Sequence, residues 1–338
     1  AVWPLALAVG CAGIMGCVTT WLVVRITRRF GLFDQPNERS AHTTPTPTVG
    51  GLGVVAGFWS GVAVLYGADS WVGEDLMGWL AASALLLLAV IDDVLRPMRP
   101  WEKMVLLLAA ITAWLAWAPY LQWLIVPGVG RVELGDWGWP LTVMWFFFMC
   151  NAFNFMDGID GLSGMQTLCV GLWTGALLWD TGTAAGPAAW LLAAAAAGFL
   201  FFNLPPARIF MGDVGALFIG FSIAACGILG AQAGIPLWCS VAVLAVYIFD
   251  VVYTIVRRGL RGENLTHAHR KHLYQRLDRI GWSHWRIDVV AVGITSLMGM
   301  GVYGYLAGLV VSLGLCGLGG IVLAAGAVWI ETRDPDFV

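Results

Sequence analysis

The apolar residues of this chain fall into long runs that are separated by short polar segments. A helix needs about 20 apolar residues to cross the hydrocarbon core of a membrane, and eleven runs approach that length. The pattern therefore predicts eleven spanning helices, with the N-terminus outside, at residues 3–24, 50–67, 76–91, 104–126, 139–156, 162–179, 186–203, 214–231, 235–256, 287–307 and 309–330. The last two runs nearly fuse, which leaves ten spans as the alternative.

Composition supports the same class. Of the 338 residues, 59% are hydrophobic and 12% are charged, whereas a soluble domain carries about 25% charged residues. We expect one all-α, polytopic membrane domain over 1–338, with a polar tail at 331–338 and no nucleic-acid partner. The first run lacks a basic region before it and is interpreted as a retained span rather than a cleaved signal peptide. The seven cysteines lie inside apolar runs and are interpreted as small buried hydrophobic residues.

The basic residues test the number of spans. With eleven spans, alternate connections lie on opposite sides of the membrane. One set of connections holds 17 of the 18 Lys and Arg residues, and the other holds only Arg131. Because basic loops face the cytoplasm, the sequence predicts that the connections 25–49, 92–103, 157–161, 204–213 and 257–286 and the C-terminal tail are cytoplasmic.

Acidic residues gather where spans end on that same side. Asp92 and Asp93 close the third span, Asp157 and Asp160 follow the fifth, and Asp213 opens the eighth. Charged groups beside a span are costly, so they are candidates for function. Helix capping is the competing interpretation, strongest for Asp213, because an acid in the first turn favours the helix dipole. Together the acids predict one site at the cytoplasmic face, suited to a hard cation or to general-base catalysis.

Two further segments carry polar side chains. In the segment 151–162 (NAFNFMDGIDGL), amides and carboxylates recur every third residue from Asn151, and the glycines let the backbone turn. The loop 257–286 contains the segment 269–276 (HRKHLYQR), which predicts a short amphipathic helix at the membrane interface. Zinc ligation, an anionic-lipid patch and phosphate binding by Arg and His are the three interpretations of this loop. For Asp250, a structural ion pair with Arg257 or Arg258 is expected.

The first basic loop adds donors to the same face. Arg39 and His42 lie in an extended, proline-containing segment that leads to Gly50 and Gly51. The glycine pair alone is equally typical of close helix packing.

These motifs, in this order and spacing, resemble those of the polyprenyl-phosphate N-acetylhexosamine-1-phosphate transferases, also called glycosyltransferase family 4. The resemblance covers about residues 20–285. Within the family, the sequence is most similar to the bacterial enzymes that initiate O-antigen synthesis. The segments 151–162 and 269–276 are the most specific parts. The chain departs from the family pattern at Arg96, where many relatives have a third acid, and at Ala216, where a serine is common.

The resemblance implies transfer of a sugar 1-phosphate from a UDP-linked N-acetylated sugar to undecaprenyl phosphate, with release of UMP. It implies a site facing the cytoplasm in the bacterial inner membrane, with Mg²⁺ as cofactor and Mn²⁺ as the alternative. The implied catalytic residues are Asp92, Asp93 and Asp213. Asp213 and Asn154 are the implied metal ligands, with Asp92 and Asp93 as further candidates. The implied substrate-binding residues are Arg39, His42, Lys103, Asn151, Asn154, Asp157, Asp160, His269, Arg270, His272 and Arg276.

Several alternatives stay open from the sequence. Either Asp92 or Asp93 is the base, and a two-step route through an aspartyl intermediate competes with direct attack by the lipid phosphate. A secondary transporter is the rival class, although transporters usually show internal repeats and acids near the bilayer midplane, and neither is found here. A structural scaffold leaves the amides and the His-Arg segment unexplained. The sugar (GlcNAc, FucNAc or QuiNAc type) and a homodimer are left undecided.

Overall fold

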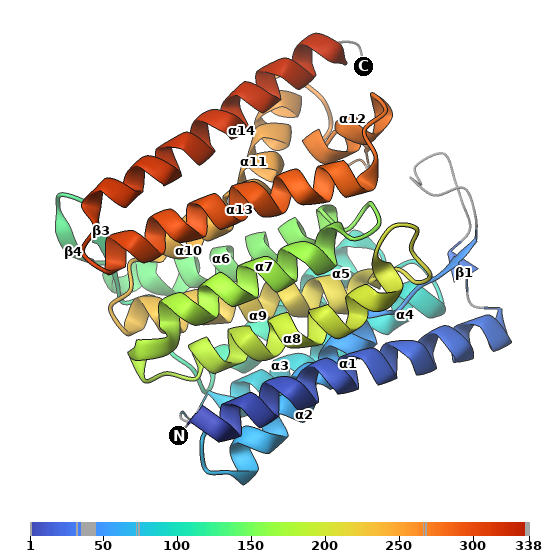
Figure 1. The fold of residues 1–338 in the computed structure, drawn as a ribbon, viewed down its shortest axis with the longest axis horizontal. Helices are drawn as coiled ribbons and strands as arrows, with labels where there is room; N and C mark the ends of the chain where they lie inside the picture. Colours follow the sequence, from blue (N-terminus) through green and yellow to red (C-terminus); the bar gives the residue numbers. More distant parts are fainter. Residues whose placement is uncertain are drawn as a thin grey trace.

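The chain forms a bundle of membrane helices. The computed structural model describes residues 2–31, 33–34, 45–71, 73, 75–265, 267 and 269–334. Within these residues the α-helices are α1 (Val2–Phe30), α2 (Gly51–Gly67), α3 (Leu76–Leu86), α4 (Val90–Val94), α5 (Pro100–Leu115), α6 (Gly138–Phe155), α7 (Leu162–Leu178), α8 (Ala185–Asn203), α9 (Gly212–Gln232), α10 (Leu237–Val243), α11 (Ala245–Leu260), α12 (Leu273–Arg279), α13 (His284–Leu306) and α14 (Leu313–Arg333). Most run side by side along one direction (Figure 1).

The prediction of an all-α polytopic membrane protein is confirmed. A helix forms at each of the predicted apolar runs, because only a helix satisfies the backbone hydrogen bonds of a single segment in lipid. Among the described residues, six helices are long and apolar enough to cross a membrane, or seven if the bent pair α10–α11 counts as one span.

Two predicted spans differ from the structure. The run 104–126 is helical only as far as Leu115, and its end forms β3 (Trp123–Val126), which pairs with β4 (Gly130–Glu133) in an antiparallel hairpin. Gly128 and Gly130 have positive φ, which allows the chain to reverse there. The apolar residues of β3 therefore resemble a continuation of the preceding helix in sequence but lie in a hairpin.

The run 235–256 is the second difference. Its two helices, α10 and α11, meet at an angle of 83°. The polar side chains Asp250, Thr254 and Arg257 of α11 are buried. Asp250 accepts the N–H of Leu273 at the start of α12, Arg257 contacts Glu331 of α14, and Thr254 donates to Asp250 in its own helix.

Helix α9 lies at the centre of the bundle. Every residue of α9 from Val214 to Ala231 is buried, and α9 packs against α2, α6 and α8. Phe218 and Phe221 of α9 meet Phe58, Trp79 and Phe146 in edge and tilted ring contacts. The start of α9, where Asp213 lies, is therefore held by a rigid core.

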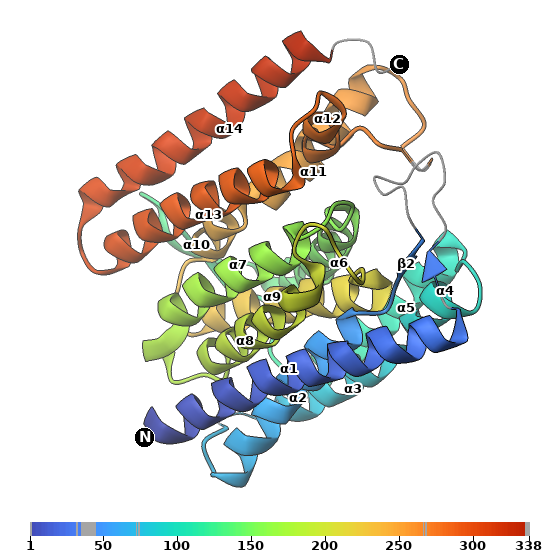
Figure 2. The same ribbon diagram turned by 45° about the vertical axis from the view of Figure 1, so that its right-hand side comes forward.

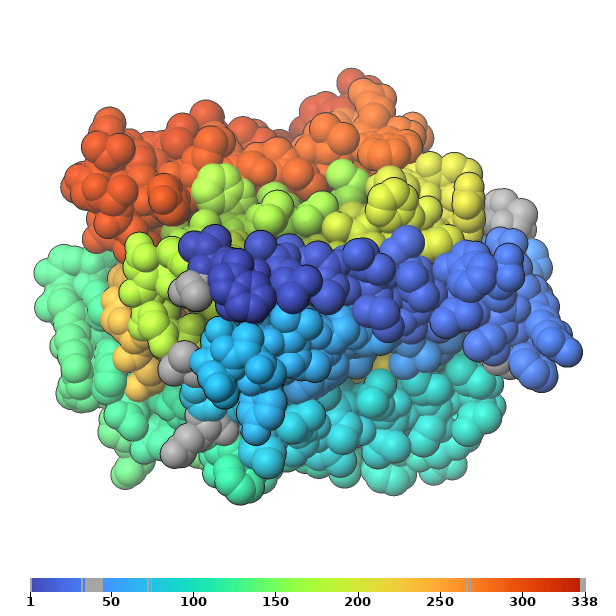
Figure 3. Space-filling model, turned by 60° about the horizontal axis from the view of Figure 1, so that its bottom comes forward, coloured from blue at the N-terminus to red at the C-terminus, as the bar shows by residue number. Residues whose placement is uncertain are grey.

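Helices α1, α2 and α8 approach closely through small residues. A Cβ on Gly57 would lie 2.6 Å from the carbonyl oxygen of Ala12, and one on Gly198 would lie 2.3 Å from that of Gly13. Small residues allow such contacts between membrane helices. The outer flank of α1 is exposed along one face of the molecule (Figure 3).

The predicted alternation of connections agrees with their positions in space. Helices α4 and α12 and the end of α14 gather at one end of the bundle, and the β3–β4 hairpin lies at the other (Figures 1 and 2). The end that carries α4 and α12 is called the α12 end below. A second, two-residue pairing joins β1 (Phe33–Asp34) to β2 (Thr46–Pro47), also at the α12 end.

Candidate functional site

Three carboxylates meet at the α12 end of the bundle. Asp92 and Asp93 come from α4 and Asp213 from the first turn of α9, and one oxygen of each lies within 4.8 Å of the others. These residues are called the acid cluster. The helices α4 and α9 bring together residues that are 120 positions apart in the sequence and that were predicted to share one site.

Asp93 fixes the start of α9. Its two carboxylate oxygens accept the backbone N–H groups of Asp213 (3.0 Å) and Val214 (3.2 Å). A carboxylate at this position satisfies unpaired N–H groups and favours the helix dipole. Gly212 has φ +75°, and a Cβ there would lie 2.8 Å from the Asp93 carboxylate. Glycine at 212 therefore allows this close approach.

Lys103 of α5 supplies a positive charge inside the acid cluster. Its Nζ lies 2.9 Å from Asp92 Oδ2 and also contacts the Asp213 carboxylate. The other oxygen of Asp92 accepts the N–H of Met98. The amide Nδ2 of Asn154, from the end of α6, donates to Asp213 Oδ1 over 2.9 Å. Lys103 and Asn154, both expected at the site, thus join α5 and α6 to it.

The acid cluster fits a hard cation. Carboxylate oxygens, with amide oxygens and water, are the ligands that Mg²⁺ takes in proteins. Two of the three side chains, Asp92 and Asp213, already pair with one positive charge, the ammonium of Lys103. Asn154 uses its Nδ2 in the contact with Asp213, so its amide oxygen remains a potential neutral ligand.

The turn between α6 and α7 lies beside the acid cluster. Burial raises the pKa of Asp157 to about 7, and the nearby charge of Asp213 adds to the shift. Asn151 donates to the carbonyl oxygen of Phe147, four residues back in its own helix, over 2.7 Å. Asp160 accepts the N–H of Ala207 over 3.0 Å. These contacts place Asp157 toward α9 and Asp160 toward the loop after α8.

The segment 269–276 packs onto the same turn. The rings of His269 and His272 lie 5.1 Å apart, and the hydroxyl of Tyr274 donates to the carbonyl oxygen of Phe155 over 2.9 Å. Burial, together with the positive charge near it, lowers the pKa of His269 to about 4. Arg270 pairs with Asp278 at 3.6 Å. A short helix forms here, α12, but it begins only at Leu273, so His269 and Arg270 precede it.

The structure corrects the role expected for Arg276. The side chain is fully buried, and its guanidinium contacts Glu331 Oε1 (2.7 Å) and Asp334 Oδ2 (3.0 Å) near the end of α14. Arg257 also contacts Glu331, and Arg279 contacts Asp334. These five residues are called the C-terminal cluster. With its guanidinium bound to α14, Arg276 acts as a structural residue rather than a ligand for substrate.

The ion pair expected for Asp250 is also wrong. Arg257 belongs to the C-terminal cluster, and Arg258 pairs with Glu263 at 3.1 Å. Asp250 instead contacts His272 at 2.9 Å. Two residues expected at the site, Arg39 and His42, lie outside the described residues.

Sequence reasoning missed two residues that hold the turn. Asn203, the last residue of α8, accepts the N–H of Gly161 over 3.1 Å and donates to the carbonyl oxygen of Ile209 over 2.9 Å. His284 Nδ1 accepts the N–H of Asp160 over 3.3 Å. One signal in the sequence could have identified them. Asn203 and His284 are polar residues next to an apolar run, and both lie on the side of the predicted membrane that carries most of the Lys and Arg residues.

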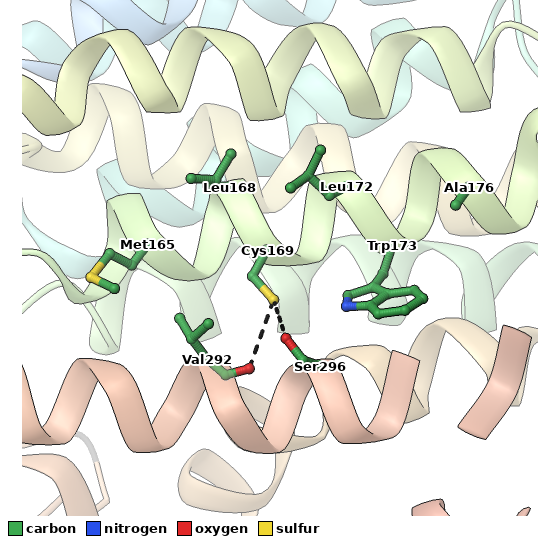
Figure 4. Close-up of a pocket in the computed structure, with 8 residues that line it drawn as sticks. All are labelled: Met165, Leu168, Cys169, Leu172, Trp173, Ala176, Val292 and Ser296. Carbon is green, nitrogen blue, oxygen red and sulfur yellow. Dashed lines mark hydrogen bonds between the residues drawn. The ribbon is translucent and has the colours of Figure 1, made fainter. Parts of the chain in front are cut away.

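A groove between α7 and α13 does not contain these groups. It is lined by apolar side chains together with Cys169 and Ser296, whose Sγ and Oγ atoms lie 3.4 Å apart (Figure 4). Cys169 lies within this packing, in agreement with the interpretation of the cysteines as hydrophobic residues. None of the residues expected at the site lines this groove.

Comparisons with known proteins agree with this arrangement. The family model described as glycosyl transferase family 4 matches residues 76–231, which include the acid cluster and the turn after α6. A probable undecaprenyl-phosphate N-acetylglucosaminyl 1-phosphate transferase of Bacillus subtilis is 30% identical over 326 residues, covering 93% of this chain and 83% of the relative. A decaprenyl-phosphate N-acetylglucosaminephosphotransferase of Mycobacterium tuberculosis is 30% identical, covering 85% and 78%. A phospho-N-acetylmuramoyl-pentapeptide-transferase of Levilactobacillus brevis is 29% identical, covering 75% and 83%.

Proposed function

Because the chain belongs to glycosyl transferase family 4, we infer that it transfers a sugar 1-phosphate from a UDP-linked N-acetylhexosamine to undecaprenyl phosphate. The observation that carries this proposal is the acid cluster with Lys103 at one end of a membrane bundle. A lipid-borne acceptor requires a site at the membrane face. The product, an undecaprenyl-diphospho-sugar, is then the first lipid-linked intermediate of O-antigen or another cell-surface polysaccharide.

The site addresses the main physical difficulty of this reaction. Two anionic substrates must approach each other, so positive charge is needed where the phosphoryl oxygens gather. Mg²⁺, or Mn²⁺ in its place, would be held by Asp213 and Asn154, and would supply that charge. His269, Arg270 and His272 line the neighbouring segment and are proposed to bind the diphosphate of the donor, with Asn151, Asp157 and Asp160 shaping the adjoining turn.

The acidic residues Asp92 and Asp93 have different proposed roles. Both oxygens of Asp93 accept backbone N–H groups of α9, so Asp93 positions Asp213. We assign the base to Asp92, because its oxygens contact Lys103 and the N–H of Met98 rather than the start of α9, so accepting a proton from the lipid phosphate leaves α9 in place. An oxygen of that phosphate attacks the phosphorus bonded to the sugar, a P–O–P link forms, and the bond to UMP breaks. Isolation of a phosphosugar–enzyme or UMP–enzyme adduct would contradict this direct route.

The charge distribution supports an orientation. Of the 18 Lys and Arg residues, 17 belong to connections predicted on one side, and UDP-sugars are cytosolic. We therefore place the α12 end in the cytoplasm and the protein in the bacterial inner membrane.

The proposed function is tested with purified protein, Mg²⁺, undecaprenyl phosphate and UDP-sugars labelled in the sugar. We expect label in the lipid product and equimolar UMP with one of UDP-GlcNAc, UDP-FucNAc or UDP-QuiNAc. The variant Asp213→Asn should lose at least about 10³-fold in rate, whereas Asp180→Asn, which lies after α7 at the opposite end, should not change it. Absence of a lipid product with every UDP-sugar, together with substrate flux into vesicles, would instead identify a transporter.

A further inference from the structure

Asp250 is a buried acid that the proposed chemistry does not use. Only 4% of the residue is exposed, and it lies on α11 within the membrane bundle. A carboxylate in such a place is costly unless hydrogen-bond donors surround it. Its partners are therefore the key to its role.

The donors around Asp250 come mainly from one segment. Asp250 Oδ1 lies 2.9 Å from His272 Nδ1 and accepts the N–H of Leu273 over 3.0 Å, and Oδ2 accepts the N–H of Tyr274 over 3.1 Å. The remaining contact is local, from the hydroxyl of Thr254 at 3.2 Å. Three of the four donors thus belong to consecutive residues at the start of α12.

The contact with His272 selects one form of its ring. An ionised carboxylate can only accept hydrogen bonds, so the hydrogen of a neutral His272 must be on Nδ1. That leaves Nε2 as the nitrogen that can contact a ligand: in the neutral ring it accepts a hydrogen bond from a hydroxyl or amide of the sugar nucleotide, and in the protonated ring it donates one to a diphosphate oxygen. The His272 ring contacts the rings of Phe155 (5.9 Å between centroids), His269 (5.1 Å) and Tyr274 (6.0 Å), which hold it beside the end of α6.

The same segment reaches the turn that carries Asp157. The hydroxyl of Tyr274 donates to the carbonyl oxygen of Phe155 over 2.9 Å. A Cβ on Gly158 would lie 2.1 Å from that hydroxyl, so the turn and Tyr274 fit only with glycine at 158. A fixed start of α12 is therefore also a fixed contact with the residues beside the acid cluster.

We propose that Asp250 is a positioning residue that sets the tautomer of His272 and holds the segment 269–276 against the turn between α6 and α7. This role rests on the proposed function, in which that segment binds the diphosphate of the sugar nucleotide. Carboxylates that orient a functional histidine in this way occur at many sites, and losing one typically costs 10- to 100-fold in affinity or activity.

The test compares Asp250→Asn with a matched control, Asp75→Asn. Asp75 is also buried and accepts a hydrogen bond from Trp79 Nε1 over 3.0 Å, but it precedes α3 at the opposite end of the bundle. We expect Asp250→Asn to lower kcat/KM by about 10- to 100-fold, mainly through a higher KM for the UDP-sugar. Asp75→Asn should change it less than about twofold, even where its thermal midpoint falls equally.

A second measurement does not depend on activity. Nitrogen-15 NMR of histidine-labelled protein should show the Nδ1–H form for His272 in the wild type, assigned by the loss of its signal in His272→Gln. In Asp250→Asn we expect a mixture of tautomers and faster proteolysis within 261–272. An unchanged tautomer, or kcat/KM within twofold of the wild type, would overturn the proposal. If the wild type transfers no sugar phosphate, the proposed function fails, and the tautomer and proteolysis still decide the role of Asp250.

Discussion

The sequence contains two lysines, and only Lys103 enters the acid cluster. Its ammonium bridges Asp92 and Asp213 and reduces the repulsion among three carboxylates. A cation bound at the same oxygens must displace this ammonium, so Lys103 competes with a metal ion for them.

Lys103→Met should therefore make stability depend on a divalent cation. We expect a lower thermal midpoint than the wild type in chelator. We also expect at least about a tenfold fall in the Mg²⁺ concentration for half-maximal stabilisation, since a charge within 4 Å of these oxygens is removed. Thermal unfolding in detergent, with Mg²⁺ titrated in, measures both. Lys271→Met is the control, because Lys271 pairs with Glu263 at 2.9 Å; an equal response of the two variants would contradict the competition.

The buried ring of His269 leads to a prediction of how stability changes with pH. Burial lowers its pKa to about 4, below the value of about 6.5 for a free histidine. Between these values the unfolded chain binds the proton and the folded protein does not, so acidification through this window lowers stability. His269→Gln should lose less stability between about pH 6.5 and 4 than the wild type, as measured by chemical unfolding. Parallel pH curves for the two proteins would refute the neutral, buried state.

At the residue scale, the acids were predictable and their partners were not. Asp92, Asp93 and Asp213 could be chosen because charge is rare beside membrane helices. That Asp93 binds the backbone of α9, or that Asp250 binds the start of α12, depends on contacts across 20 to 120 residues. No local pattern encodes such contacts.

At the element scale, the crossing of α2 and α9 brings backbones into contact beside the acid cluster. A Cβ on Gly51 would lie 2.2 Å from the Cα of Gly215, and the N–H of Gly51 donates to the carbonyl oxygen of Met211 over 2.8 Å. The glycine pair that was equally typical of helix packing is thus a packing contact that also places the start of α9.

Gly51→Ala should separate these helices. We expect a cost of about 3 kcal/mol, at the upper end for overpacking because backbone rather than a flexible side chain must move, and a loss of any activity that needs Asp213. Gly67→Ala, at the far end of the same helix, has open space around it and should be neutral. Thermal midpoints and transferase rates of the two variants check this; similar behaviour would exclude the close crossing.

The helices themselves were predictable from apolar runs, and their changes of direction were not. The residues Trp123 to Val126 are as apolar as a membrane helix, yet they form a strand, because the glycines at 128 and 130 allow a reversal. Hydropathy records how apolar a segment is, and it contains no information on the 83° bend between α10 and α11.

At the scale of the whole molecule, the C-terminal cluster joins three segments that are far apart in sequence. Glu331 contacts Arg257 of α11, Arg276 of α12 and the hydroxyl of Tyr253 at 2.7 Å. The segment that carries His272 is therefore tied to α14 as well as to Asp250.

Glu331→Gln should remove the negative charge that pairs with the buried guanidinium groups of Arg257 and Arg276. Removing one partner of a buried ion pair costs about 3–5 kcal/mol, and we expect about 3 kcal/mol here because Asp334 still contacts Arg276. The apparent midpoint in detergent should fall, and α12 should become accessible to protease. Glu133→Gln, in the exposed pair with Arg131 on the β3–β4 hairpin, should change neither; equal effects of the two variants would argue against the role of this cluster.

The C-terminal cluster also has a consequence for biosynthesis. The ribosome makes α14 after all the other described helices, and until residue 334 has emerged Arg257 and Arg276 have no counter-charge from Glu331 and Asp334. The segment 269–276 then cannot reach its final packing while the chain is still being translated. A polypeptide that stalls or is cut short before α14 would be inserted in the membrane but without a finished site, so the packing of the segment 269–276 would be completed only after the end of α14 has been made.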